Sequence, residues 1–179
     1  SSVPGPAWRS RPAASSSAWA VARTPGATSR SWRRKVATWA VASTLWASDP
    51  DWEKSTGQVW RIDRNRDITR VAADMGTTNG IEVSPDGHTL YVNESIQRNL
   101  WAFRIERDRT LSGKRLIVQF PDGGFDGMRC DIDGNLYITR PGKGTVVVVS
   151  PQGKVLHEVD VLGKRPTNLC FGGADGRTC

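Results

Sequence analysis

The feature that most restricts the fold is a sequence pattern that recurs along the C-terminal part of the chain. NGIEVSPDGHTLYVN at 79–93 resembles DGMRCDIDGNLYIT at 126–139, and TNLCFGGADGRTC at 167–179 begins the same pattern again. The Asp-Gly turns of the three copies begin at Asp86, Asp133 and Asp175. The repeat is therefore 47 residues long and then 42, with a weaker echo at 37–50.

Each repeat contains short apolar runs that are rich in β-branched and aromatic residues. One unit has the runs GIEVS, TLYVN, NLWAFRI and RLIVQF, and the next has GMRCDI, NLYIT, TVVVV and KVLHEVDV. The runs are too short for helices, and glycine, proline, Asp or Asn separates them, as between strands. A period of 40 to 50 residues with four strands is typical of a propeller blade.

The pattern predicts an all-β fold, a partial β-propeller of about three blades. Two blades are complete in sequence, with one partial blade before them and one after. We expect almost no helix over residues 56–179. Since propellers close with about 4 to 8 blades, the chain is expected either to be truncated or to pair with another copy.

The N-terminal segment has a different character, which predicts two regions, an irregular one at 1–35 and a propeller domain at 36–179. Residues 1–48 carry seven of the 25 Lys and Arg residues and no Asp or Glu, whereas the rest of the chain has 18 of each sign. Residues 1–35 show no lasting period of 2 or 3.6, and their composition offers little apolar surface to offset the entropy of ordering.

Two interpretations of this basic segment stay open. Arg side chains on phosphates and Trp stacked on bases would make a nucleic-acid tail, whose affinity would fall steeply with salt. A non-native leader is the favoured alternative, and its removal should not weaken the propeller. No run of 18 apolar residues and no secretory signal is present, so we expect neither membrane insertion nor export, and a cytoplasmic location. The three cysteines form no CxxC pair and are expected to be free thiols.

The two repeats and the blade between them identify a family. TNGIEVSPDGHTLYVNES, followed by FDGMRCDIDGNLYITRPGKG and the strands after it, resembles the SMP-30/gluconolactonase/LRE-like family. The resemblance covers about residues 45–179. It implies a six-bladed propeller that binds a divalent cation in its central channel and, in many members, hydrolyses sugar lactones. It favours Ca²⁺, with Zn²⁺, Mg²⁺ and Mn²⁺ as alternatives.

The family's metal ligands correspond to Asn79 and Asp126, and Asp126 is also its implied general base or proton shuttle. The repeat supports the pair independently, because both residues immediately precede the first strand of a blade. Equivalent residues of adjacent blades converge on the channel, so two oxygens within about 5 Å could share one Ca²⁺. The alternative is that Asn and Asp before glycine are ordinary turn residues.

The sequence also departs from the family. Residues 1–35 contain no carboxylate for the Glu that the family uses near its first blade, and the alignment puts Lys35 at a position where the family has Asn. Asp49 and Glu53 lie where related proteins contact substrate and are weak substrate-binding candidates. We therefore expect an impaired, metal-dependent lactone hydrolase with a small-molecule lactone as its partner. A non-catalytic propeller fragment that acts as a binding surface, and a basic-tail nucleic-acid binder, remain as alternatives.

Overall fold

The computed structural model describes residues 17–23, 38–44, 57–174, 176 and 178–179. Within these ranges the chain forms twelve strands and no helix. The strands make three four-stranded sheets, each with its strands in sequence order and antiparallel to their neighbours. This arrangement confirms the predicted all-β partial propeller.

The first sheet contains β1 (Ser17–Arg23), β2 (Thr38–Thr44), β3 (Gly57–Ile62) and β4 (Ile68–Met75). The prediction that residues 1–35 are irregular is wrong for β1, which pairs with β2 along its whole length, from Ser17 opposite Thr44 to Arg23 opposite Thr38. The edge of β2 supplies the backbone hydrogen bonds that hold β1 as a strand. The amino-acid composition of residues 1–35 could not predict this, because it says nothing about a pairing partner elsewhere in the chain. The rest of 1–35 lies outside the described residues, and the domain boundary at 35/36 stays a prediction.

The second and third sheets follow the two blades predicted from the repeats. The second contains β5 (Thr78–Val83), β6 (Thr89–Glu94), β7 (Asn99–Ile105) and β8 (Leu111–Gln119). The third contains β9 (Met128–Cys130), β10 (Leu136–Arg140), β11 (Thr145–Val149) and β12 (Val155–Asp160). Each is a meander of hairpins, in which short turns favour pairing between strands that follow one another.

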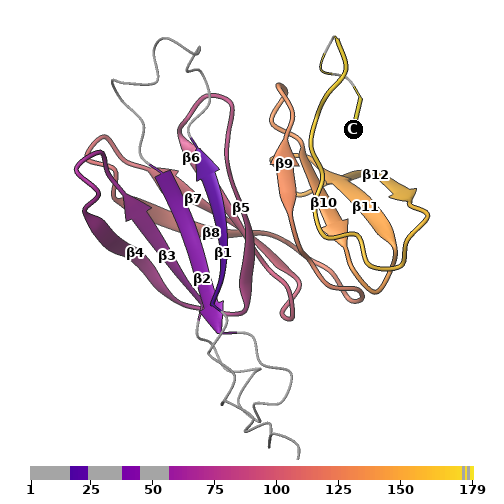
Figure 1. The fold of residues 1–179 in the computed structure, drawn as a ribbon, viewed down its shortest axis with the longest axis horizontal. Helices are drawn as coiled ribbons and strands as arrows, with labels where there is room; N and C mark the ends of the chain where they lie inside the picture. Colours follow the sequence, from indigo (N-terminus) through magenta and orange to yellow (C-terminus); the bar gives the residue numbers. More distant parts are fainter. Residues whose placement is uncertain (1–16, 24–37, 45–56, 175, 177) are drawn as a thin grey trace, which may run out of the picture.

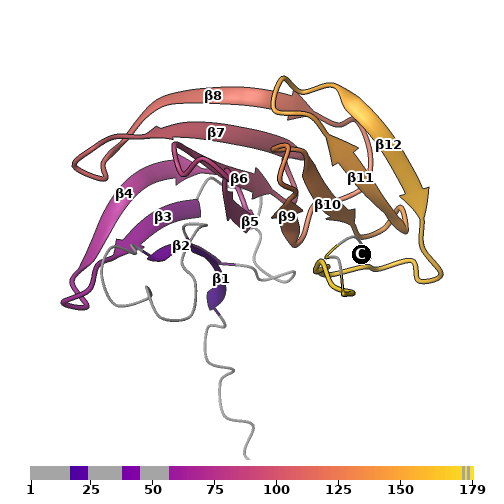
Figure 2. The ribbon, with the colours of Figure 1, turned by 90° about the horizontal axis from the view of Figure 1, so that it is seen from above.

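The three sheets lie side by side in an arc (Figures 1 and 2). Figure 2 shows β4, β8 and β12 along the outer side of the arc, with β5 and β9 on its inner side. The first and last strands of each sheet therefore lie at opposite ends of a radial row. This order brings the beginnings of β5 and β9 to the inside of the arc, where the candidate residues lie.

Alternation along the strands produces two cores, one on each side of the second sheet. Leu90 and Val92 of β6 pack toward the first sheet, with Trp39, Val59 and Met75. Tyr91, between them in sequence, packs toward the third sheet, in a cluster that includes Met128 and Leu136. Successive side chains of a strand point to opposite faces, so the middle sheet is buried on both.

Glycines form the turns, at the predicted Asp-Gly pairs 86–87 and 133–134 and at the Pro-Gln-Gly sequence 151–153. Gly87, Gly134 and Gly153 have φ values of 76°, 86° and 90°, a left-handed conformation that glycine adopts without steric cost. The amide of each donates to the carbonyl three residues earlier, on Ser84, Asp131 and Ser150. None of the described residues forms a helix with the length and apolar character needed to cross a membrane.

Candidate metal and active site

Asn79 is the second residue of β5, at the inner side of the arc. It is half-buried, and its Nδ2 donates to the Ser95 Oγ at 3.1 Å. Ser95 directly follows β6 and donates its own hydroxyl proton to the Phe125 carbonyl at 2.5 Å. The side chain of Asn79 is thus connected, through one hydroxyl, to the loop that enters the third sheet.

Asp126 lies in that loop, two residues before β9. Its backbone amide donates to the Thr139 carbonyl at 3.1 Å, and its carbonyl accepts from the Asn93 Nδ2 at 2.7 Å. The next amide, of Gly127, donates to the Thr167 carbonyl at 2.8 Å. The backbone around Asp126 is therefore held from three sides, by β6, by β10 and by the segment that follows β12.

The structure brings the two predicted residues near each other, because the Asn79 side chain lies close enough to the Asp126 carboxyl to act on its pKa. Burial raises the pKa of the Asp126 carboxyl above its usual value, and the nearby Asn79 side chain and Gly127 amide only partly oppose this rise. A partly desolvated carboxylate and the oxygen of a neighbouring amide side chain are together a donor set suited to a hard cation. It also suits a general base, whose pKa works best when raised toward neutrality.

The glycines after the two residues are required for space rather than for a turn. Neither Gly80 nor Gly127 has a left-handed φ. A Cβ on Gly80 would lie 2.5 Å from the Asp126 carbonyl oxygen and would overlap the amide of Asn93, while one on Gly127 would overlap the amide of Asn168. The turn interpretation of these Asn-Gly and Asp-Gly pairs therefore does not apply here; the backbones of neighbouring sheets approach closely at this point.

Sequence reasoning missed three residues around the pair. Asn93 and Ser95 lie at the end of β6, and Asn168 stands at the position of the third repeat that Asn79 and Asp126 occupy in the first two. The repeat gives a signal for Asn168. For Asn93 and Ser95 the sequence gives only a weak indication of a role in the site, namely two polar residues, two positions apart, at the end of an apolar strand.

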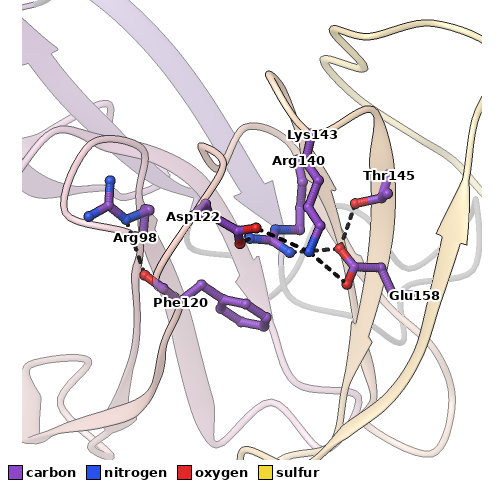
Figure 3. A network of polar contacts seen from close by, with 7 residues as sticks. All are labelled: Arg98, Phe120, Asp122, Arg140, Lys143, Thr145 and Glu158. Carbon is purple, nitrogen blue, oxygen red and sulfur yellow. Dashed lines mark hydrogen bonds and ion pairs between the residues drawn. The ribbon is translucent and has the colours of Figure 1, made fainter.

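The loop that carries Asp126 is also anchored at its beginning, by Arg140 at the end of β10 (Figure 3). The guanidinium of Arg140 is completely buried and pairs with the carboxylates of Asp122 and Glu158, each at 2.6 Å. It lies 4.4 Å from the centre of the Phe120 ring. The ion pairs thus join the loop to the outer strand β12 of the third sheet.

The remaining predicted residues cannot be placed. Lys35, Asp49 and Glu53 lie outside the described residues. Within the described part of the chain, no cluster of three or more His, Cys, Asp or Glu residues could hold a metal ion. Asn79 and Asp126 fit a cation by the chemistry of their oxygens, but they supply two of the six to eight oxygens that Ca²⁺ takes.

A hollow of about 610 Å³ lies at the opposite end of the same strands, between the turns that carry Asp86 and Asp133, with Arg115 of β8 at its wall. It is wide and holds neither Asn79 nor Asp126. At the Asn79–Asp126 end, by contrast, the side chains of Asn93 and Ser95 hydrogen-bond to the loop that enters the third sheet.

Comparison with known proteins decides the family. Residues 37–179 match the model of the SMP-30/gluconolactonase/LRE-like region. The chain belongs to this family. A 6-deoxy-6-sulfogluconolactonase of Pseudomonas putida is 29% identical over 129 residues, which are 70% of this chain and 44% of that relative.

Two solved structures have the same fold over the part that they share with this chain. Regucalcin from Agrobacterium tumefaciens, described as a calcium-binding protein, is 26% identical with a TM-score of 0.68, over 78% of this chain and 47% of that one. A gluconolactonase from Xanthomonas campestris is 28% identical with a TM-score of 0.62, over 75% and 46%. The chain thus spans about half the length of the relatives it matches.

Proposed function

We propose that this family member is part of a divalent-metal-dependent hydrolase of sugar lactones, with Asn79 and Asp126 as metal ligands. The observation that carries the proposal is the proximity of the two side chains at the beginnings of two successive blades, where Asn79 acts on the pKa of the Asp126 carboxyl. The names of the relatives support the substrate class, and the calcium-binding regucalcin supports Ca²⁺ as the first choice of cation.

A bound divalent cation would polarise the lactone carbonyl and stabilise the negative charge that develops on its oxygen. In the same site, the carboxylate of Asp126 accepts the proton of the water that attacks the carbonyl carbon. It then returns this proton to the ring oxygen as the ester C–O bond breaks, so that the product is the open hydroxy acid. The amide of Asn79 orients the Asp126 carboxylate.

The two described ligands fill a minority of a cation's coordination, so we expect weak cation binding and slow hydrolysis by this chain. Asp49 and Glu53 stay proposed substrate contacts. A second candidate function, binding of nucleic acid by the basic segment, has no support among the described residues.

The test is hydrolysis of gluconolactone by the full chain, with and without added Ca²⁺, Zn²⁺, Mg²⁺ or Mn²⁺. Asp126→Asn keeps the shape but removes the charge and the base, and should lower metal-dependent hydrolysis by at least about 100-fold. Asp133→Asn, in an exposed turn at the other end of the blade, is the matched control. Unchanged hydrolysis in Asp126→Asn, or a wild-type rate that a chelator does not alter, would show that the proposal is wrong.

A further inference from the structure

Ser95 connects Asn79 to the loop before β9 through its own hydroxyl. Its backbone amide donates to the Thr77 carbonyl at 2.8 Å, so Ser95 is fixed beside the beginning of β5. Its Oγ accepts from Asn79 Nδ2 and donates to the Phe125 carbonyl. The two contacts together determine the direction of each hydrogen bond.

A serine hydroxyl has one proton, and here a carbonyl oxygen, which can only accept, takes it. Toward Asn79 the hydroxyl can therefore only accept, so the nitrogen of the Asn79 amide must face Ser95. The Oδ1 atom is then turned away from Ser95. An amide is otherwise free to present either atom, and only the oxygen can bind a cation.

Asn93 acts in the same way on the backbone. It is completely buried, its Oδ1 accepts from the Gly80 amide at 2.8 Å, and its Nδ2 donates to the Asp126 carbonyl at 2.7 Å. One side chain thus spans the residue after Asn79 and the backbone of Asp126. Its length sets how far apart the two proposed ligands can lie.

We infer that Ser95 and Asn93 are positioning residues of the cation site: Ser95 orients the Asn79 amide so that Oδ1 is the atom offered to the cation, and Asn93 fixes the spacing of Asn79 and Asp126. The inference rests on the proposed function and assigns to β6 the role of setting the site's geometry. Neither residue is proposed as a ligand of the cation.

The first test is calorimetric titration of the full chain with Ca²⁺. Ser95→Ala should weaken Ca²⁺ binding by about 10- to 100-fold, the usual effect of losing a group that orients a ligand, and Ser95→Thr, which keeps the hydroxyl, should restore it. Ser84→Ala is the matched control, since it also removes a hydroxyl with two hydrogen bonds, at the opposite end of the same hairpin. Equal affinity in wild type and Ser95→Ala overturns the inference, as does a loss that threonine does not recover.

The second test needs no cation and so separates this inference from the proposed function. In wild type, the Asn79 side-chain amide should give one sharp pair of NMR signals; in Ser95→Ala the pair should broaden or double as the amide turns over. If wild type binds no cation, the proposed function fails, and the NMR result still decides the inference. An unchanged Asn79 signal pair in Ser95→Ala means that Ser95 does not orient the amide.

Discussion

At the scale of single residues, the site depends on the two glycines that follow its proposed ligands, Gly80 and Gly127. Gly80 allows the second sheet to approach the Asp126 backbone, close to where Asn79 lies beside Asp126, and Gly127 leaves space for Asn168, which follows β12. Asn93 fills the space that a side chain on Gly80 would need. Close packing leaves no room for an added methyl group where backbone, rather than a flexible chain end, is the neighbour.

Gly80→Ala should therefore destabilise the protein. The new Cβ meets the Asp126 carbonyl and the Asn93 amide, so we expect a loss of about 1 to 3 kcal/mol of unfolding free energy, together with weaker cation binding. Gly163→Ala is the control, because a Cβ there has no atom within 4 Å and its φ is not left-handed. Denaturant unfolding of both variants measures the difference; equal midpoints would contradict the proposed close approach.

The thiols should differ in reactivity. Cys130 is partly buried, and burial together with the nearby carboxylates of Glu82 and Asp131 raises its pKa to about 12. Because the thiolate is the reactive form, only about one Cys130 in ten thousand is ionised at pH 8. Cys170 and Cys179 are exposed. A thiol-specific reagent should label two cysteines quickly and the third only after denaturation, whereas three equal rates would refute this.

At the scale of elements, the loop before β9 is held at both ends, by β6 near Asp126 and by Arg140 near Asp122. A hydrogen bond from Arg140 holds the pKa of Asp122 below its usual value. Burial raises the pKa of Glu158, but hydrogen bonds from Thr145, Arg140 and Lys143 outweigh it and leave the value lowered. The carboxylates of Asp122 and Glu158 thus neutralise the charge of the completely buried Arg140 guanidinium. The order of the strands alone would not reveal this pairing.

Arg140→Met should lower the unfolding free energy by about 1 to 3 kcal/mol, because the hydrogen bonds from the guanidinium to Asp122 and Glu158 are lost. Lys143→Met, at the rim of the same cluster, should cost less than about 1 kcal/mol. Carboxyls with depressed pKa values stabilise the fold above their unfolded values, near 4, and lose this contribution as pH falls through the folded values. Wild type should therefore lose more stability than Arg140→Met between pH 5 and acid denaturation, by thermal melts at several pH values; parallel pH profiles would argue against the network.

At the scale of the whole molecule, three sheets share two cores, and the middle sheet is buried on both faces. The site depends on this arrangement, because Asn79 comes from the second sheet and Asp126 from the loop into the third. The first sheet includes β1, from the segment that composition marks as foreign, and it packs through Trp39, Val41 and Val59 against the second. The N-terminal region thus contributes to the fold through at least one strand.

Truncation tests whether β1 stabilises the fold or whether the N-terminal segment can be removed without effect. Removal of residues 1–23 deletes β1 and exposes the edge of β2, and should lower stability by more than about 2 kcal/mol, or roughly 5 °C in Tm. Removal of residues 1–16 keeps β1 and should leave the Tm within about 1 °C of the Tm of the full chain. Circular dichroism melts compare the two, and equal Tm values would show that β1 adds nothing to the stability of the arc.

The sequence alone determined the strands of the second and third sheets, their grouping in fours, their turns and the matching positions of Asn79 and Asp126, because these follow from local alternation and from the repeat. Only the tertiary structure decided which atoms meet there. The bridges through Asn93 and Ser95, the space required at Gly80 and the pairing of β1 depend on how separate segments approach in space. Such contacts leave no periodic trace in the residues that make them, so no pattern along the chain could have predicted them.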